Sequence, residues 1–235
     1  MKPKLLDLFC CAGGAGMGYS RAGFDVVGVD IKPQPRYPFE FHQADALQYL
    51  AEHGAEFDFI HASPPCQAYM DTNKGGAKPS KHPRLIEPTR ELLHKIGKPF
   101  VIENVHLAPL RANLMLCGTM FDLRVIRHRY FECSDPPVFT PYCNHWGSVA
   151  AGDFVGVYAF GGRGHRHGKG KRDGPSEPAK VTASEAMGID WMKEKELFEA
   201  IPPAFTQFIG SHAITRLTKR EPDVCNVTVG VGIGQ

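Results

Sequence analysis

One cysteine of this sequence stands where a reactive thiol is expected. Cys66 follows the apolar run 57–60 within the segment His-Ala-Ser-Pro-Pro-Cys-Gln, residues 61–67. The two prolines fix the backbone, and a thiol at the carboxyl end of a buried strand faces the sheet edge where α/β proteins bind ligands. A lone cysteine is more often a small buried hydrophobe. The rigid, polar, strand-terminal setting favours a nucleophile here.

Two further motifs could act beside this thiol. Glu103 ends a second apolar run in Glu-Asn-Val, and a carboxylic acid beside a nucleophile can donate a proton or hydrogen bond to a ring nitrogen if the site raises its pKa. Arg127 and Arg129 alternate with His128, which predicts both guanidinium groups on one face of a strand. Solvated surface arginines are the simpler interpretation of the second motif.

A glycine-rich turn precedes both motifs. It covers residues 10–18, directly after the apolar run 4–9, and the next apolar run ends in Asp30. Small residues let the backbone approach a ligand, and an acid at the next strand end can accept hydrogen bonds from ribose hydroxyls. The dinucleotide spacing fails at Tyr19 and Arg21, and no phosphate-binding P-loop occurs. The pattern suits S-adenosylmethionine, with Asp45 predicted to bind the adenine amino group, whereas a tight turn made for packing is the alternative.

The elements that must position these residues alternate along the chain. Apolar runs predict parallel strands at 4–9, 25–30, 57–63 and 98–105, with helical spacing at 16–24, 44–54 and 89–97. This order predicts an α/β fold with a doubly wound, mostly parallel sheet. After residue 132 the pattern degrades, with a strand-like stretch at 153–160, a helical segment at 182–201 and a second helix at 204–217.

These motifs resemble those of the DNA (cytosine-5) methyltransferases. The resemblance rests on the cofactor loop at 7–24, on PPCQ at 64–67, on ENV at 103–105 and on RHR at 127–129, in matching order from about residue 4 to 132. A weaker match, AIPPAF at 200–205, looks like the family's last motif, a helix that returns to the cofactor site. The resemblance implies a Rossmann-like methyltransferase fold with a small irregular target-recognition insertion.

The resemblance also implies a mechanism. Cys66 would attack C6 of a flipped-out cytosine, and Glu103 would engage N3 and the exocyclic amine so that C5 takes the methyl group of S-adenosylmethionine. Arg127 and Arg129 would hold the base carbonyl and a nearby phosphate. The same chemistry on RNA, and a catalytically idle relative that only binds nucleic acid or cofactor, are the alternatives.

The predicted organisation has four parts, and two sets of binding residues are predicted beside the catalytic residues Cys66, Glu103, Arg127 and Arg129. A catalytic domain spans 1–132, a small recognition region 133–180, C-terminal helices that return to the catalytic domain 181–218, and a tail 219–235. The predicted cofactor-binding residues are Phe9, Cys11, Ala12, Gly13, Gly14, Gly16, Met17, Gly18, Asp30, Ile31, Asp45, Ala46, Pro64, Ala200 and Ile201. The predicted DNA-binding residues are Gln67, Lys74, Lys78, Arg163, Arg166, Lys169 and Lys171, the last four within a basic run that would contact phosphate.

The small recognition region and the loop after the nucleophile carry two further predictions. A region as short as 133–180 offers few base-edge contacts, which predicts short or relaxed sequence specificity. The segment from Ala68 to about Pro88, with Gly75 and Gly76 as hinges, is the candidate for a lid that closes on double-stranded DNA.

Composition sets the remaining expectations. Lys and Arg number 27 against 25 Asp and Glu, so overall charge does not by itself demand a polyanion. No apolar run approaches the roughly 20 residues of a membrane span, which predicts a soluble cytoplasmic protein without membrane contact, and a monomer is expected. Seven cysteines without regular spacing predict free thiols. Cys133, Cys143 and His145, with His165 or His167, could bind zinc, but no C-x-x-C pair is present and unliganded loop residues are expected.

Overall fold

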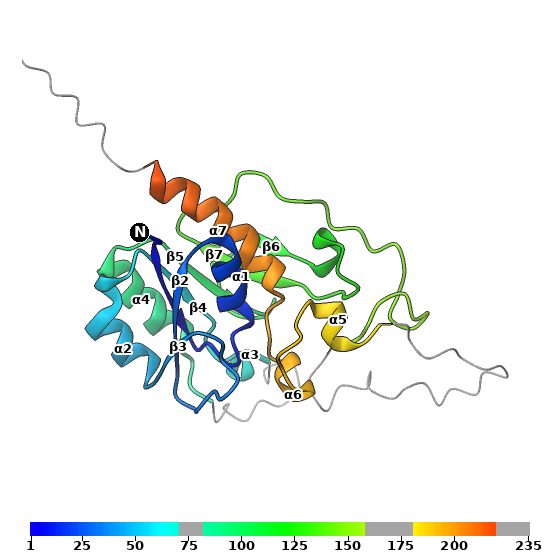
Figure 1. Cartoon of the computed structure of the whole chain (residues 1–235), viewed down its shortest axis with the longest axis horizontal. Helices are drawn as coiled ribbons and strands as arrows, with labels where there is room; N and C mark the ends of the chain where they lie inside the picture. Colours follow the sequence, from blue (N-terminus) through cyan, green and yellow to red (C-terminus); the bar gives the residue numbers. More distant parts are fainter. Residues whose placement is uncertain (71–81, 158–180, 220–235) are drawn as a thin grey trace, which may run out of the picture.

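A seven-stranded sheet with helices on both faces forms the body of the protein in the computed structural model, which describes residues 1–70, 82–157 and 181–219 (Figure 1). The strand order is β3-β2-β1-β4-β5-β7-β6. The first five strands are parallel, whereas β7 pairs antiparallel with both β5 and β6. The predicted doubly wound, mostly parallel sheet is confirmed. The strands are β1 (Lys4–Leu8), β2 (Asp25–Asp30), β3 (Glu40–Gln43), β4 (Phe59–Ala62), β5 (Phe100–Asn104), β6 (Leu114–Leu116) and β7 (Arg129–Cys133).

Two helical layers cover the sheet. Helices α1 and α7 pack on each other over one face, and α2 and α4 lie together over the other (Figure 1). Strand β1 is buried on both faces, with Leu5 in the core below α1 and α7 and Leu6 in the core below α2 and α4. The helices are α1 (Gly14–Ala22), α2 (Ala46–His53), α3 (Gln67–Met70), α4 (Ile86–Ile96), α5 (Ala183–Met187), α6 (Glu194–Leu197) and α7 (Pro203–Thr218), with short 3₁₀ turns η1 (Gly54–Glu56) and η3 (Gly118–Phe121).

The contact between α1 and α7 is close because glycine stands where the helices meet. A Cβ atom on Gly18 would lie 2.0 Å from Thr206 Oγ1, and one on Gly210 would lie 2.8 Å from the Cβ of Ala22. Thr206 also donates a hydrogen bond of 2.8 Å to the carbonyl of Ala15. The C-terminal helix is therefore fixed against the start of the chain, as its predicted return to the catalytic domain requires.

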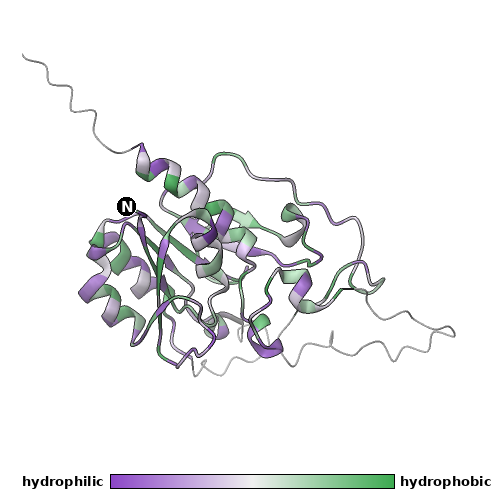
Figure 2. Cartoon of the chain, in the orientation of Figure 1, coloured by the Kyte–Doolittle hydropathy of each residue, from purple (hydrophilic) through white to green (hydrophobic). Residues whose placement is uncertain are grey.

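Two predicted elements differ from the structure. The helical segment 182–201 is two short helices, because α5 ends at Gly188, which takes a left-handed conformation with φ of 66°. The strand predicted at 153–160 is wrong over its described part, since residues 153–157 are turn and irregular backbone; residues 158–160 lie outside the described ranges. Polar and apolar residues mix along the helices (Figure 2), and no helix in the described ranges has the length and hydrophobicity of a membrane span.

Candidate active site

The predicted motifs meet at one edge of the sheet, where the parallel strands β1, β2, β4 and β5 have their carboxyl ends. The glycine-rich turn leaves β1, Asp30 ends β2, the Pro-Pro-Cys segment leaves β4, and Glu103 lies near the end of β5. Because neighbouring parallel strands end side by side, motifs about 90 residues apart in sequence come together. Sequence order alone placed these groups correctly.

The segment that carries Cys66 is held by backbone contacts to both neighbouring strands. The amide of Ser63 donates to the carbonyl of Leu8 at 3.1 Å, and the side-chain amide of Asn104 donates to the carbonyl of Pro64 at 2.7 Å. The second contact joins the Glu-Asn-Val motif to the Pro-Pro-Cys motif. Burial raises the pKa of the Cys66 thiol, Arg129 opposes this shift, and Glu103 adds to it. The guanidinium of Arg129 is thus the cation that favours a thiolate at this position.

Glu103 is a buried acid next to a fixed cation. Only 6% of the residue is exposed, and its Oε1 lies 2.9 Å from Nε of Arg129. Burial raises the pKa of Glu103, while Arg129, the Ser63 hydroxyl and Arg127 pull it down. The net shift is upward, so the carboxyl holds a proton at higher pH than an ordinary glutamate, as the sequence analysis required of a proton donor.

A buried chain of polar side chains lies behind this acid, and the sequence analysis missed it. The Tyr19 hydroxyl is 3.0 Å from Nδ1 of His61, and Nε2 of His61 is 2.9 Å from the hydroxyl of Ser63, which hydrogen-bonds Glu103. Burial lowers the pKa of His61 to about 3, so the imidazole is neutral. The direct signal was His61 and Ser63 alternating in the strand-to-loop segment before the prolines, which places them on one side of the backbone.

Arg127 departs from its predicted position. The two arginines do not share a strand face, because β7 begins only at Arg129. Arg127 is 6% exposed and donates from Nη1 to the carbonyl of Val157 at 2.8 Å and from Nη2 to that of Phe198 at 2.7 Å. Its guanidinium therefore joins two distant segments, and Arg129 is the arginine that contacts the acid.

The turn after β1 has strained backbone, as ligand-binding turns often do. Phe9 and Cys11 have positive φ values of 58° and 46°, unusual for residues with side chains. The carboxylate of Asp30 stabilises this conformation, since its Oδ2 accepts from the amide of Cys11 at 3.1 Å and its Oδ1 from that of Lys32 at 3.0 Å. Asp30 thus stabilises the turn independently of any contact with a ribose.

The glycines of the turn are explained first by packing against the protein itself. A Cβ on Gly13 would meet Pro38 at 2.9 Å, one on Gly14 the carbonyl of Ile201 at 2.5 Å, and one on Gly16 the carboxyl group of Asp7 at 2.9 Å. Packing within the protein, the alternative interpretation, therefore accounts for small residues at these positions. Gly13 also has φ of 84°, which favours glycine.

Groups suited to a nucleoside surround the turn nonetheless. Ile31 is 65% exposed directly after Asp30 and offers an apolar surface to a planar ring. Asp45 caps α2 by accepting from the amides of Leu47 and Gln48 through Oδ1 alone, so the cap does not use Oδ2. Ala46 and Pro64 flank the same edge, and Met17 lies in the first turns of α1. These features fit a cofactor with an adenosine group.

The C-terminal segment returns to this edge through contacts that sequence reasoning did not foresee. Trp191 donates from its indole nitrogen to the carbonyl of Ala12 at 2.8 Å. Arg36 pairs with both carboxylate oxygens of Glu196 at 2.7 and 2.5 Å. Ala200 and Ile201 are buried, as expected if this segment completes the site.

Most of the predicted DNA-binding residues lie outside the part of the chain that the structure describes. Gln67 begins α3 directly after the nucleophile. The other six, and most of the predicted lid, lie outside the described residues; they are Lys74, Lys78, Arg163, Arg166, Lys169 and Lys171. At the start of the predicted lid, Ala68 and Tyr69 are buried, which anchors that end of the segment.

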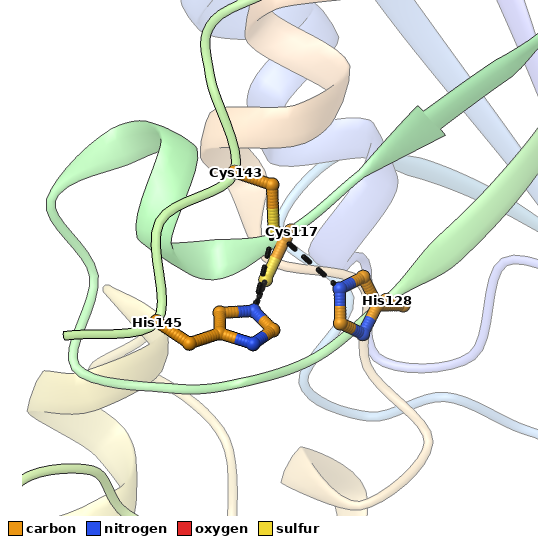
Figure 3. Close-up of side chains that lie close together, drawn as sticks. All are labelled: Cys117, His128, Cys143 and His145. Atoms are coloured by element: carbon orange, nitrogen blue, oxygen red, sulfur yellow. Dashed lines mark hydrogen bonds between the residues drawn. The ribbon is translucent and has the colours of Figure 1, made fainter. Parts of the chain in front are cut away.

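A second group of chemically active side chains lies apart from the predicted site. Cys117, His128, Cys143 and His145 bring one sulfur or nitrogen atom each to within 4.8 Å of one another (Figure 3). The sequence analysis considered Cys143 and His145 as possible metal ligands, but it did not consider Cys117 or His128. Cys133, from the set considered in the sequence, instead lies buried in β7 among core residues.

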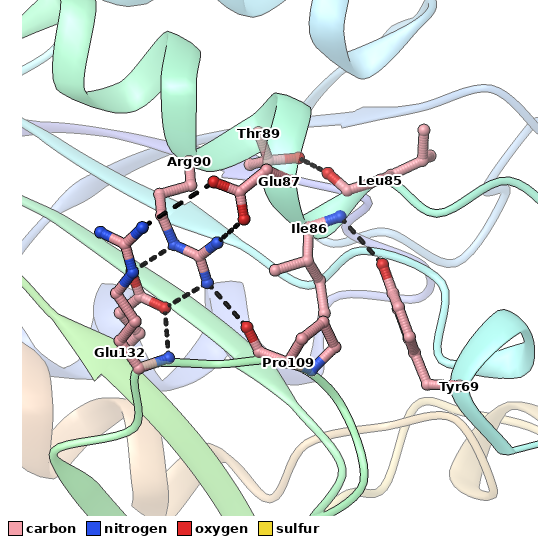
Figure 4. A network of polar contacts seen from close by, with 9 residues as sticks. Tyr69, Leu85, Ile86, Glu87, Thr89, Arg90, Pro109 and Glu132 are labelled. Carbon is pink, nitrogen blue, oxygen red and sulfur yellow. Dashed lines mark hydrogen bonds and ion pairs between the residues drawn. The ribbon is translucent and has the colours of Figure 1, made fainter.

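The helix after the nucleophile segment is tied to the sheet by a buried ion pair. Arg90 in α4, 2% exposed, contacts both carboxylate oxygens of Glu132 in β7 at 2.7 Å and also pairs with Glu87 (Figure 4). The amide of Ile86, at the start of α4, donates to the hydroxyl of Tyr69 at 3.1 Å. These contacts fix α3 and α4 on either side of residues 71–81.

Comparisons with known proteins agree with this geometry. No family model matches the chain. A segment is 30% identical over 120 residues to the type II methyltransferase M.XorII of Xanthomonas oryzae pv. oryzae, covering 44% of this chain and 28% of that relative, so the chain matches only about a quarter of its length. Three solved structures share the fold: Entamoeba histolytica methyltransferase EhMeth, S. pombe Dnmt2 methyltransferase and a prophage-encoded E. coli protein described as a DNA modification methyltransferase.

The structural matches extend over nearly the whole chain. EhMeth has a TM-score of 0.62 at 12% identity, covering 92% of this chain and 99% of its own. Dnmt2 has a TM-score of 0.57 at 13% identity with the same coverage, and the prophage protein 0.58 at 15%, covering 93% of this chain and 100% of its own. The predicted Rossmann-like methyltransferase fold is confirmed, and the match to part of M.XorII agrees with the family resemblance. The methyltransferase relationship supports S-adenosylmethionine as the cofactor.

Proposed function

We propose that this chain is a member of the DNA (cytosine-5) methyltransferase family and that it transfers a methyl group from S-adenosylmethionine to C5 of cytosine in double-stranded DNA, acting as a monomer. The observation that carries the proposal is the joint at the ends of β4 and β5. There Asn104 binds the carbonyl of Pro64, which sets the thiol segment against Glu103, and Arg129 lies next to that acid. A thiol, a protonatable acid and a fixed cation at one sheet edge are what addition across the cytosine 5,6 double bond needs.

The chain's own residues would act in a definite order. Cys66 gives its proton to solvent, Arg129 stabilises the resulting thiolate, and the sulfur forms a bond to C6 of the base as the electron pair of the 5,6 double bond moves toward C5. Glu103 supplies a proton or hydrogen bond at N3, which takes up the negative charge that develops on the ring. The methyl group that C5 accepts would come from bound S-adenosylmethionine, which would leave as S-adenosylhomocysteine. Removal of the C5 proton by a base then breaks the bond between sulfur and C6 and restores the ring.

The proposed cofactor position follows from the edge of the sheet. The backbone of residues 9–13 and the N-terminus of α1 would face the amino-acid portion of the cofactor. Asp30 and Ile31 would contact the ribose and the adenine ring, and the free oxygen of Asp45 would accept from the adenine amino group. Trp191, through its contact with Ala12, would hold the turn in the conformation that binds the cofactor.

The test is product identification. The purified chain is incubated with S-adenosylmethionine carrying a deuterated methyl group and, separately, with duplex DNA, single-stranded DNA and RNA, and the digested nucleosides are measured by mass spectrometry. The proposal expects labelled 5-methyl-2′-deoxycytidine from duplex DNA, none from Cys66→Ala, and undiminished product from Cys133→Ala, the matched control for a thiol away from the site. Label on an exocyclic amine, or turnover by Cys66→Ala equal to that of the unaltered chain, would overturn it. Label in RNA alone would show that the chain methylates cytosine in RNA and not in DNA.

A further inference from the structure

Four side chains near the far edge of the sheet have the geometry of a metal site. Nε2 of His145 lies 3.3 Å from the sulfur of Cys117 and 3.2 Å from that of Cys143. Nε2 of His128 lies 3.6 Å from the sulfur of Cys143, and the two imidazole rings are 5.1 Å apart between centroids. The four side chains point toward one another (Figure 3).

These separations match those between the ligands of a tetrahedral ion. With zinc–sulfur and zinc–nitrogen bonds of about 2.3 and 2.0–2.1 Å, sulfur and nitrogen ligands at the tetrahedral angle stand about 3.6 Å apart. The three measured sulfur–nitrogen distances run from 3.2 to 3.6 Å. Two thiolates and two neutral imidazoles in tetrahedral array select zinc among the common divalent ions. We propose that Cys117, His128, Cys143 and His145 bind one structural zinc ion.

The ligands come from two kinds of segment. Cys117 is buried between β6 and η3, and His128 lies directly before β7, so both belong to the framework of the sheet. Cys143 and His145 belong to residues 134–157, which contain no helix or strand. The Thr119 hydroxyl donates to the sulfur of Cys117 at 3.5 Å and lies 3.8 Å from that of Cys143, as an outer contact that would orient both sulfurs.

Residues 134–157, hereafter the irregular segment, have no helix or strand to order them, and the ion would hold them in place instead. Stretches this long without regular structure are uncommon in compact domains unless something else orders them. His128 stands between Arg127 and Arg129, so the ion would also attach the irregular segment directly beside the arginine that contacts Glu103. Four exposed apolar side chains, Val138, Phe139, Tyr142 and Trp146, are carried on the segment close to the two ligands.

The first test measures metal content. The full chain is purified without a metal-affinity tag under reducing conditions, and zinc is quantified by plasma mass spectrometry. One zinc per chain is expected in the unaltered protein and in Cys133→Ala, the matched buried-thiol control. Cys143→Ser and His145→Asn should lose most of it; both positions are at least partly exposed, so these variants should fold, which circular dichroism verifies. Cys117→Ser is the third variant, but its buried position makes it the least decisive.

Cobalt substitution gives an independent readout of geometry. Cobalt(II) added to the metal-free chain should give the intense visible bands of tetrahedral coordination and a thiolate charge-transfer band that decreases in Cys143→Ser. A chain that stays metal-free after reconstitution with zinc would overturn the proposal. Equal zinc in Cys143→Ser and the unaltered chain, or a Cys117–Cys143 disulfide as the native state, would do so as well. None of these readouts depends on methyltransferase activity.

Discussion

The sheet edge and the irregular segment are ordered by different means. At the sheet edge, parallel strands and their backbone hydrogen bonds fix Glu103 and the turn before Cys66, and side chains such as Asn104 only refine the geometry. In the irregular segment, side chains from the framework provide the order: Arg124 donates to the carbonyl of Asp153 at 2.6 Å, and Arg127 to that of Val157. The residues proposed for catalysis lie on the rigid part, and the segment with exposed aromatic side chains is attached to it at a few points.

This difference predicts how substitutions act in each region. At the sheet edge a change should alter the rate of the reaction or the stability of the whole fold. In the irregular segment a change should loosen a local piece of chain while the rest stays folded.

The largest expected effect is that of Glu103→Gln. The amide cannot supply the proton that the buried carboxyl holds, so kcat should fall by about 10²–10⁴ with the fold unchanged. Because burial raises the pKa of Glu103, activity that needs its protonated form should decline as pH rises through that pKa. A pH–rate profile of the unaltered chain checks this. Ser63→Ala removes the hydroxyl that contacts His61 and pulls down the pKa of Glu103, so the decline should move to higher pH in that variant. An unchanged kcat in Glu103→Gln would contradict the assignment.

Arg90→Met should cost about 3–5 kcal/mol of unfolding free energy, because it leaves the buried carboxylate of Glu132 without its cation. Urea unfolding measures the loss. The double variant Arg90→Met/Glu132→Leu should recover a large part of it, since no uncompensated charge remains. If Arg90→Met lowers the free energy of unfolding by less than about 1 kcal/mol, the ion pair contributes little to the stability of the fold.

Asp7→Asn should change how stability depends on pH. Burial raises the pKa of Asp7 to about 8 from its usual 3.8, against the hydrogen bonds of Tyr37 and Gly16. Between those values the folded chain holds a proton that the unfolded chain does not, so stability falls as pH rises toward 8, by about 1.4 kcal/mol per pH unit for one proton. Urea unfolding at pH 5, 6.5 and 8 should show this slope in the unaltered chain and a shallower one in Asp7→Asn. Parallel slopes would contradict a protonated Asp7.

Arg124→Met should have the smallest effect. It should lower the free energy of unfolding by about 1 kcal/mol, because the carbonyl groups that Arg124 contacts can hydrogen-bond to water instead. Its effect should be local: faster hydrogen exchange and proteolysis within residues 148–157, with the sheet unchanged. Arg111→Met, whose side chain is 69% exposed, is the matched control and should change neither. Faster hydrogen exchange throughout the sheet in Arg124→Met would contradict the prediction that changes in the irregular segment act locally.

The sheet edge was predictable from sequence because parallel strands bring their carboxyl ends together whatever their spacing. The turn, Cys66 and Glu103 each follow an apolar run, so topology alone placed them on one edge. The packing of the glycines was not predictable, since Ile201 and Pro38, which crowd Gly14 and Gly13, come from segments whose approach no local pattern encodes. In the Tyr19–His61–Ser63 chain, His61 and Ser63 had a local signal, but the approach of Tyr19 from α1 had none.

The metal ligands were not predictable as a set. Cys117 and His128 stand 26 and 15 residues from Cys143, and no short paired motif marks them. Their approach depends on the antiparallel pairing of β6 with β7, which places the two strand ends side by side. The prediction for the paired arginines was wrong for a related reason: alternation in sequence implied one strand face, but the strand begins two residues after Arg127.

The most direct test of the account is covalent trapping at Cys66. The chain and S-adenosylmethionine are incubated with duplex DNA in which the target cytosine carries fluorine at C5, which blocks loss of the C5 substituent and preserves the bond between sulfur and C6. The account predicts a protein–DNA adduct whose mass includes one transferred methyl group and whose peptide map places the link on Cys66. An adduct on another cysteine, or none while cofactor binding is intact, would contradict it.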